Sequence, residues 1–507
     1  MLASGCARTN FFQADARLTA VEVAARHLPP AGPDSVWATA GRHYAQHGRL
    51  HGWLVGRHHR AAWAAPVRVP VLALRTARPE AGPLTPTKLG GGFQSTSLSL
   101  RGADGRPYVL RTIDKDPARI LPKFFQKTFV ANVLRDETSA GTPYGALVLP
   151  VLAQALGIAH AQPRVFYVLA GADFGLPEAN ARLSGKLVLL EEKLSGPHAR
   201  SPLLPTARAY LDEAALAERL AASPRARLDQ PALLRARLLD VLVGDWDRHA
   251  GQWQWAELPD SLHPLDRQRL VAVPKDRDQV FFRFADGLLP WLLTRRGPAR
   301  HLTTFGAAIR DLPALVSNGR RVDERGLNEL RRRDFRAAAA LVQACLPDSV
   351  LARAVRRLPP AAFAAEGNGL LAALRRRRDQ LPAVAEAYFT LLARRPVVRS
   401  TREAERFVVD RMPDSTTVRV YSRALGPDSL CFARTFYRRE TRRLLLADLD
   451  AADVRDVRGR GGLRVRWASR QPASLDAGRD KKPRPGRAAP GPAAADRAGP
   501  EAASGAE

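Results

Sequence analysis

The pattern of apolar and polar positions divides the chain into stretches of different kinds. In residues 66–74 and 96–112, apolar and polar residues alternate and turn residues stand between the runs, which is typical of strands and hairpins. Leucines recur at helical spacing in residues 229–243, and Arg/Ala/Leu helical patterns fill residues 323–395. Alternation returns in residues 416–421. The pattern predicts an α+β fold: a strand-rich part, then a helical part, then a small all-β part.

Changes in these patterns also mark the domain boundaries. The predicted segments are a lead-in with short helices and a strand (1–80), a β-rich N-lobe (81–195), a helical C-lobe (196–396), a small β-sandwich-like domain (397–467) and a disordered tail (468–507). In the lead-in we expect helices near residues 18–26 and 36–47. The tail has almost no large apolar residue, so it cannot bury enough surface to fold.

A polar loop follows the leucine-rich helix pattern and carries candidate catalytic residues. An apolar helix that delivers Asp247, Arg248 and His249 into a loop has the layout of a phosphoryl-transfer catalytic loop. There, Asp247 would orient an attacking hydroxyl. Five residues later, the amide oxygen of Gln252 would help to hold a metal on nucleotide phosphates. Asp245 is the alternative to Asp247, which is preferred because Arg and His follow it.

A second pair of carboxylates follows a short apolar strand. The run 270–274 ends at Asp276 and Asp278. Mg²⁺ prefers oxygen ligands and keeps several waters, so one or two protein carboxylates are enough to bind it. A loop acid followed by a strand that ends in a metal-binding acid is the order found in protein-kinase-like folds.

A glycine cluster lies at the start of the β-rich lobe. Gly90, Gly91 and Gly92 precede an alternating strand, and Asp104-Gly105 is a hairpin turn. A glycine-rich hairpin lets backbone N–H groups approach phosphates closely, whereas the simpler interpretation is a loose loop. The spacing matches neither the dinucleotide-binding motif nor the P-loop motif.

Together, the local motifs resemble those of the atypical kinase-like families: the HipA-type bacterial kinases, the spore-coat CotH kinases and the secretory-pathway kinases. More closely, roughly residues 35–470 resemble an uncharacterised bacterial module that is often found upstream of surface-antigen β-barrels. The motifs are GGGFQSTSL (90–98), YVLRTIDKDP (108–117), GDWDRH (244–249) and PKDRDQVF (274–281). The resemblance implies a two-lobed protein-kinase-like domain that uses ATP and Mg²⁺.

The resemblance also implies roles for residues of the N-lobe. Arg111 aligns with the cation that grips the phosphates, and Lys115 is the other candidate. Asp136 or Glu137 would orient that cation, with Glu137 preferred. Glu192 falls in the hinge between lobes, where adenine would pair with main-chain groups.

Two residues depart from the family pattern. Arg111 stands where Lys is usual, and Gln252 stands where Asn is commonest. In the C-lobe the resemblance gives His249 the task of holding the loop backbone.

The net charge of +29 arises almost entirely from arginine spread along the chain. It indicates either an anionic partner or a genome that favours Arg codons. We prefer the second interpretation and expect no specific nucleic acid, because aromatic residues do not interleave with the basic ones. Histidines 43, 47, 51, 58 and 59 are crowded, which is typical of a solvated basic surface or of a metal site.

The beginning of the sequence bears on the compartment. It has no basic start followed by an apolar core, which predicts a cytoplasmic protein as written. However, residues 2–6 resemble the lipobox of a lipoprotein signal. If the true start lies upstream, Cys6 would be lipidated and the protein would be a periplasmic or outer-membrane lipoprotein.

Three functions follow from these observations. The first is an ATP- and Mg²⁺-dependent phosphotransferase whose acceptor and oligomeric state the sequence leaves open. The second is a catalytically inactive kinase-like scaffold associated with the cell envelope. The third is a basic protein that binds anions or nucleic acid.

Overall fold

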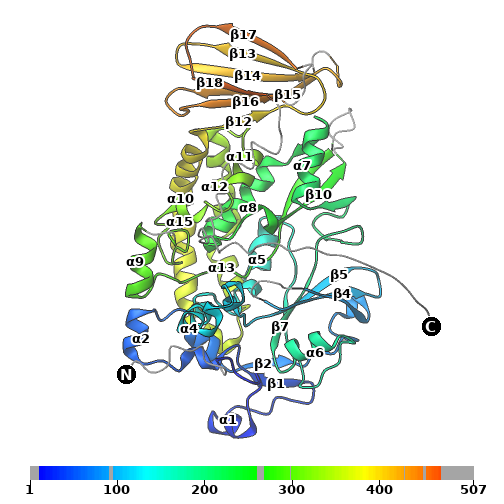
Figure 1. Cartoon of the computed structure of the whole chain (residues 1–507), viewed down its shortest axis with the longest axis vertical. Helices are drawn as coiled ribbons and strands as arrows, with labels where there is room; N and C mark the ends of the chain where they lie inside the picture. The colour runs from blue at the N-terminus through cyan, green and yellow to red at the C-terminus, as the bar shows by residue number, and fades with distance from the viewer. Residues whose placement is uncertain are drawn as a thin grey trace, which may run out of the picture.

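The computed structural model describes residues 11–90, 95–259, 268–296, 299–426, 429–448 and 453–469 (Figure 1). The predicted mixed α+β character is confirmed, since several sheets and many helices are present. The predicted tail lies outside the described residues apart from its first two, Ala468 and Ser469, which belong to a strand.

The lead-in packs short elements beneath the first large sheet. The helices are α1 (Ala20–Ala25), η1 (Arg42–Ala45), α2 (Arg49–Leu54) and α3 (Arg60–Ala64). Strand β1 (Ser35–Ala38) pairs antiparallel with β2 (Val67–Pro70). The helix expected at 36–47 is therefore wrong in its first part: Val36 and Ala38 face the core, and the backbone pairs with β2.

A five-stranded antiparallel sheet forms the β-rich part, in the order β3-β4-β5-β7-β6. Its strands are β3 (Leu84–Gly90), β4 (Ser97–Gly102), β5 (Pro107–Thr112), β6 (Arg164–Tyr167) and β7 (Leu187–Glu192). One face buries Leu98, Tyr108, Leu110 and Leu190 in a common core with helix α6 (Pro177–Leu183). The short helix η2 (Pro79–Ala81) precedes β3. Between β5 and β6 lie η3 (Pro117–Ile120), η4 (Phe125–Lys127), α4 (Phe129–Asp136), η5 (Glu137–Ala140), η6 (Gly145–Leu147) and α5 (Leu149–Ala155).

The helical part is built around α8 (Gln230–Val243), which is buried along almost its whole length. Asp229 caps its start by accepting a hydrogen bond from the Ala232 amide, and Pro231 is tolerated in the first turn. Helices α12 and α15 pack against it. The other helices of this part are α7 (Glu213–Ala222), α9 (Leu288–Arg296), α10 (Leu312–Leu315), α11 (Arg320–Gly326), α12 (Arg332–Cys345), α13 (Asp348–Val355), α14 (Pro360–Ala362) and α15 (Asn368–Ala393).

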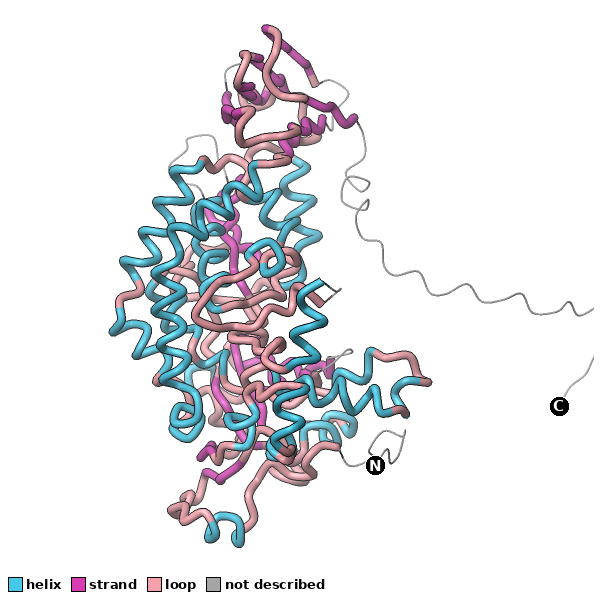
Figure 2. Tube along the Cα trace, turned by 90° about the vertical axis from the view of Figure 1, so that its left-hand side faces the viewer, coloured by secondary structure: helices cyan, strands magenta, loops and turns pink. Residues whose placement is uncertain are grey.

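A second sheet lies within the helical part, in the order β8-β10-β11-β9. Its strands are β8 (Ala209–Leu211), β9 (Ala226–Leu228), β10 (Trp253–Pro259) and β11 (Gln268–Pro274). Strands β10 and β11 form an antiparallel pair that runs in continuous register from Trp253 opposite Pro274 to Pro259 opposite Gln268. In Figure 2 the largest layer of helices lies along one side of the strands in the middle of the molecule.

Two further sheets form a separate β domain at one end of the molecule (Figure 1). One contains β12 (Val397–Arg399), β16 (Leu444–Asp448) and β18 (Val465–Ser469); the other contains β13 (Glu405–Arg411), β14 (Ser415–Ser422), β15 (Ser429–Tyr437) and β17 (Val454–Gly459). Both sheets contribute to one core, in which Val398 and Leu446 meet Phe407 and Val418. This arrangement has the two-layer character expected of a small sandwich.

Among the described residues, no single helix has the length and apolar character needed to span a membrane, and only the bent pair α12–α13 passes that test jointly.

Candidate active site

The β10–β11 hairpin brings the two acidic loops together. Because Trp253 pairs with Pro274, the residues just before β10 must lie beside those just after β11. The amide of Lys275 donates to the carbonyl of Gln252 at 3.1 Å, which extends the pairing by one step. The loop that carries Asp247 is therefore held next to the loop that carries Asp276 and Asp278.

The end of α8 sets where the first loop begins. Gly244 adopts a left-handed conformation (φ 71°), and its amide donates to the last carbonyls of the helix. Such a cap ends a helix and turns the chain sharply. The Asp245 amide then donates to the Asp240 carbonyl at 2.9 Å.

Arg248 fastens the two loops to each other. Its guanidinium is fully buried, donates to the carbonyls of Lys275 (2.8 Å) and Gln252 (2.9 Å), and lies over the ring of Trp253. The planar guanidinium group carries five N–H donors, so it can donate to carbonyl groups of two loops at once. Arg248 therefore has a positioning role, and the carboxylates that it pairs with, Asp240 at 3.5 Å and Asp245 at 3.7 Å, are both buried.

The structure separates the roles of Asp245 and Asp247. Asp245 is buried and pairs with Arg277 at 3.2 Å, next to a fully buried Asp240 that also pairs with Arg277. Burial raises the pKa of Asp245, opposed by its arginine neighbours. Asp247 instead lines the large cavity, with the amide of Asn318 3.5 Å from its Oδ1. Of the two, only Asp247 faces space where a substrate can bind.

That cavity has a volume of about 520 Å³ and lies between the five-stranded sheet and the helical part. Asp247, Asp276 and Asp278 all line it, as do Arg111 from β5 and Lys115 just after β5. Arg111 forms an ion pair with Asp276, and Lys115 forms one with Asp278. Two cations from β5 and the chain after it thus meet two carboxylates from the loop after β11.

The charged side chains of this cavity shift one another's pKa values. Burial opposes ionisation of Asp276, but Arg111 and Lys115 outweigh it and lower the pKa of the carboxyl group. Burial lowers the pKa of the Lys115 ammonium, while Asp276 and Asp247 oppose that shift. Asp276 also has a positive φ of 58°, a conformation that costs a non-glycine residue free energy and occurs often at functional sites.

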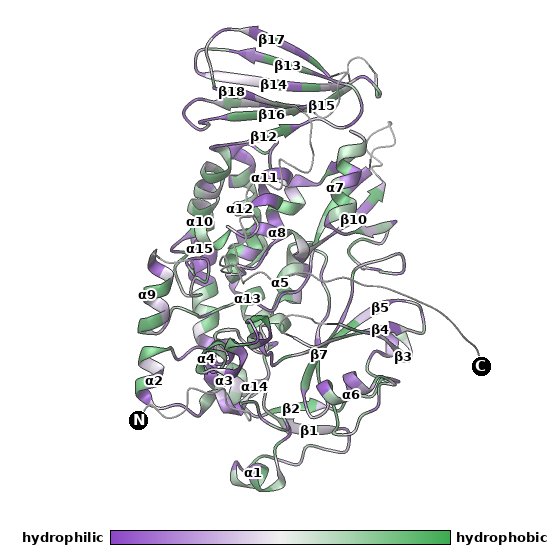
Figure 3. Cartoon of the chain, in the orientation of Figure 1, coloured by the Kyte–Doolittle hydropathy of each residue, from purple (hydrophilic) through white to green (hydrophobic). Residues whose placement is uncertain are grey.

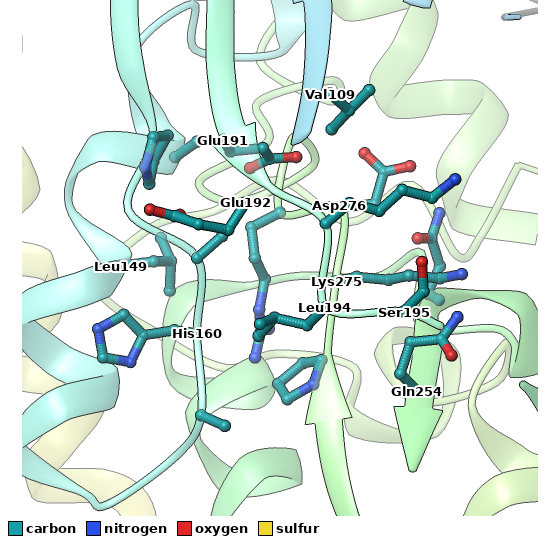
Figure 4. Close-up of a pocket in the computed structure, with 18 of the residues that line it drawn as sticks. Val109, Leu149, His160, Glu191, Glu192, Leu194, Ser195, Gln254, Lys275 and Asp276 are labelled. Atoms are coloured by element: carbon teal, nitrogen blue, oxygen red, sulfur yellow. The ribbon is translucent and has the colours of Figure 1, made fainter. Parts of the chain in front are cut away.

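A second cavity of about 310 Å³ continues from the first, with Arg111, Glu191 and Asp276 lining both (Figure 4). Gln252 and His249 line this part. Figure 4 shows that its wall combines the end of β7 and the chain after it with the loop after β11. The two cavities thus form one continuous cleft, which has charged and apolar portions.

Several polar groups in this second cavity have partners. Glu192 pairs with Arg78 at 3.0 Å and accepts a hydrogen bond from the Gln162 amide at 2.6 Å. In the amide orientation that satisfies both neighbours, the side chain of Gln254 accepts from Lys275 Nζ at 3.0 Å and donates to the Leu211 carbonyl at 2.9 Å.

Of the remaining predicted residues, Gly90 ends β3 opposite Ser97. Gly91 and Gly92 lie outside the described residues, as does Cys6. His249 is exposed, and its Nδ1 accepts a hydrogen bond from the Gly251 amide at 3.0 Å.

The resemblance assigns Glu137 the task of orienting Arg111, the cation that would bind phosphate. Glu137 lines the large cavity, and its carboxylate lies 3.9 Å from the ring of His58. Arg111 instead has Glu191 at 3.6 Å, besides Asp276. Sequence reasoning missed Glu191. Its position became visible only with the pairing of β5 and β7, which places Val109 opposite Glu191.

A second group of possible metal ligands lies in the lead-in. His47, His51 and Asp136 hold their ligand atoms within 4.8 Å of one another. Arg60, however, already donates to both oxygens of Asp136 at 2.6 Å and holds the pKa of this carboxyl well below its usual range, against the effect of burial. The described contacts therefore account for this group without an ion.

Comparison of the chain with protein-family models, curated proteins and solved structures found no match. The functional conclusion therefore depends on the geometry of the cleft and on the chemistry of its side chains.

Proposed function

We propose that the chain is an ATP- and Mg²⁺-dependent phosphotransferase. The observation that carries this proposal is the meeting of three groups in one cavity: Asp247 after α8, Asp276 after β11, and Arg111 with Lys115 from the sheet opposite. Phosphoryl transfer depends mainly on positioning and on neutralising phosphate charge, and these residue types in this arrangement are suited to both tasks.

Each group has a role that fits its surroundings. Asp247 accepts a hydrogen bond from the acceptor hydroxyl and takes its proton as the new O–P bond forms. Arg111 and Lys115 bind the phosphate oxygens of ATP. In the absence of nucleotide their charges are balanced by Asp276 and Asp278, so nucleotide binding exchanges one set of ion pairs for another.

The donor set suits a hard cation. Asp276, Asp278 and the side-chain oxygen of Gln252 are all oxygen donors, and Asp276 and Gln252 line the same part of the cleft. Mg²⁺ takes such ligands together with waters and phosphate oxygens. When bound, it would neutralise charge on the phosphates that are transferred and released.

The second cavity fits the base of a nucleotide. Leu149 and Ala153 supply apolar surface on one side, and the chain from Lys193 to Ser195, which follows β7, lies on another. Ligand sites typically combine apolar walls with a few polar groups that fix orientation. A planar base in this space would point its phosphates toward Arg111 and Asp276, which line both cavities.

One observation favours a second candidate, a scaffold that binds nucleotide without transferring phosphate. Arg111 stands at the position of the expected lysine and pairs directly with Asp276, a proposed metal ligand. An arginine that remains on this carboxylate would keep Mg²⁺ away.

Two measurements on purified protein separate these candidates. Thermal melting with and without Mg-ATP tests binding, since ligand at about 100 times Kd stabilises the native state by about 2.7 kcal/mol. Transfer or hydrolysis of γ-³²P-ATP tests catalysis. We expect Asp247→Asn to keep the melting shift and lose turnover by at least a hundredfold, and Asp276→Asn to lose the Mg²⁺-dependent part of the shift.

The matched control is Asp379→Asn, an exposed carboxylate on α15. It should behave as wild type in both measurements. A melting shift without turnover in the wild-type protein would support the scaffold. The absence of any shift with Mg-ATP would refute nucleotide binding.

A further inference from the structure

The cavity around Asp247 is polar at one end and apolar along most of its wall. The charged end contains Lys115, Asp276 and Asp278 beside Asp247. The apolar wall comes from α4, from the chain before it, and from α9 and the chain after it: Leu121, Val130, Val133, Leu134, Leu293 and Leu302. A sugar, or a hydroxyl on a polar peptide, would gain little from such a wall.

The segments that supply this apolar wall also expose large apolar side chains to solvent. Phe124 and Phe129 keep 76% and 59% of their surface exposed, and Leu292 and Leu293 of α9 each keep 54%. We call these residues, with Phe125, Val133, Leu289 and Trp291, the apolar rim. Figure 3 shows hydrophobic residues on α2 and α9, and residues of α4 and α9 line the cavity together. Soluble monomers rarely expose so many large apolar side chains next to a cleft without a binding role.

Basic residues accompany the apolar rim. Arg119, Lys123 and Lys127 are exposed in the segment that contains the phenylalanines. On α9, the guanidinium of Arg295 lies 4.3 Å from the centre of the Trp291 ring. Aromatic and leucine side chains interleaved with cations are typical of surfaces that enter the headgroup region of an anionic bilayer.

We propose that the phosphoryl acceptor is a lipid that carries a free hydroxyl, and that the apolar rim docks on the anionic membrane in which this lipid lies. The inference rests on the proposed phosphotransferase function. The hydroxyl would reach Asp247 at the charged end, while the hydrocarbon part lies along α4 and α9. The charge of the rim favours this occupant over an apolar peptide, because the phospholipid surface supplies both the hydrocarbon and the negative charge.

The reaction balances without a further reagent. The lipid hydroxyl oxygen forms a bond to the γ-phosphorus of ATP, and the bond between that phosphorus and the β–γ bridging oxygen breaks. The hydroxyl proton passes to Asp247 and then to solvent. The products are a lipid phosphate monoester, ADP and one proton.

The first test uses the wild-type protein and soluble acceptors. Turnover of γ-³²P-ATP is measured with 1-alkanols and with diacylglycerols of increasing chain length, each below its critical micelle concentration. We expect kcat/KM to rise about fourfold for each methylene that becomes buried, until the cavity is filled. A rate independent of chain length in both series, or preferential labelling of a polypeptide hydroxyl, would overturn the proposal.

The second test is sedimentation with vesicles of phosphatidylglycerol and phosphatidylcholine. We expect the wild-type protein to bind these vesicles but not pure phosphatidylcholine, and the double variant Phe129→Asp/Leu292→Asp to bind at least tenfold more weakly. The controls are Val21→Asp on α1 and Leu341→Asp on α12, which are 78% and 45% exposed and lie away from the cavity. Equal vesicle binding by the double variant and the controls would refute the docking surface.

These results are distinguishable from a failure of the proposed function. The melting shift with Mg-ATP needs no acceptor and no membrane. If that shift is present while chain length and vesicles have no effect, the lipid acceptor is wrong and nucleotide binding stands. If the shift is absent, the phosphotransferase function itself is wrong.

Discussion

At the scale of single residues, burial decides which carboxylates of the cleft carry charge. Burial, reinforced by the neighbouring Asp136, raises the pKa of Glu137 to about 8. Glu137 is therefore protonated at neutral pH and supplies no negative charge to a cation. Asp276 and Asp278 lie close to cations, and the pKa of Asp276 is lowered. Arg111 pairs with Asp276 and lies 3.6 Å from Glu191, whose pKa is raised by burial although Arg111 opposes this shift.

We expect Glu137 to make stability depend on pH. The native state keeps the proton up to a pKa of about 8, whereas the unfolded chain loses it near the ordinary value of 4.5. Between these pH values unfolding releases a proton, so this group lowers the free energy of unfolding as pH rises, by at most about 1.4 kcal/mol per pH unit. Urea titrations from pH 5 to 8 should show that Glu137→Gln removes this contribution.

The control for this measurement is Glu178→Gln, an exposed carboxylate on α6. It should leave the pH profile unchanged. A profile of Glu137→Gln that matches the wild-type profile would show that Glu137 is ionised in the native state at neutral pH.

Residues near the strand ends were predictable for a physical reason. Asp247 shortly precedes one strand and Asp276 directly follows the next, so antiparallel pairing of neighbouring strands is enough to bring them together. Glu191 was not predictable, because its approach to Arg111 depends on pairing between β5 and β7, and 74 residues lie between Thr112 at the end of β5 and Leu187 at the start of β7. The catalytic role of Asp247 and the metal-binding role of Asp276, which the resemblance implies, stay predictions.

At the scale of elements, the junction between α8 and its loop controls the position of Asp247. Gly244 is the point where the helix stops, and a Cβ atom there would lie 3.0 Å from the ring of Phe305. The left-handed conformation alone costs a non-glycine residue roughly 1–2 kcal/mol.

We therefore expect Gly244→Ala to lower the free energy of unfolding by about 1–3 kcal/mol, from strain together with the contact on Phe305. Turnover should fall as well, because Asp247 lies three residues further on. The matched control is Gly369→Ala within α15, where an added Cβ meets nothing within 4 Å and alanine should be neutral or stabilising. Equal stability of the two variants in urea unfolding would contradict this role of Gly244.

The pattern of apolar positions predicted some elements better than others. The leucine repeat of α8 and its Asp229 cap were clear, because a long buried helix combines a strong period with a start signal. Residues 36–47 were predicted as a helix, yet Val36–Ala38 form a strand. Four residues are too few to show a period, and their conformation is fixed by a partner strand about 30 residues away.

At the scale of the whole molecule, the β domain is attached to the helical part by arginine contacts. Arg434 of β15 is buried, donates to the Asn328 carbonyl at 2.6 Å, and has the rings of Phe436 and Phe389 within 4.8 and 5.7 Å. Arg332 of α12 pairs with Glu440 at 3.0 Å. Together with other contacts, such as the hydrogen bond from the Arg402 amide to the Ala221 carbonyl (2.7 Å), they link the two apolar cores.

Removal of Arg434 should loosen this attachment. We expect Arg434→Ala to lower stability by about 2–4 kcal/mol, because a charged hydrogen bond and two ring contacts are lost. Urea unfolding should change from one transition toward two, with the β domain separating first. The control Arg458→Ala removes an exposed ion pair of β17 and should leave the unfolding transition close to that of the wild type, because exposed ion pairs contribute little to stability. A single unshifted transition for Arg434→Ala would show that other contacts hold the domain.

The register of β10 and β11 has a consequence for how the protein tolerates change. Side chains alternate between the two faces of a strand, so adding or deleting one residue in either strand would turn everything beyond that point to the opposite face. Such a change would carry Asp276 away from Asp247 even though neither residue had been altered. Length changes inside this hairpin should therefore abolish activity more often than substitutions there, whereas the two loops could be transplanted together as one intact piece.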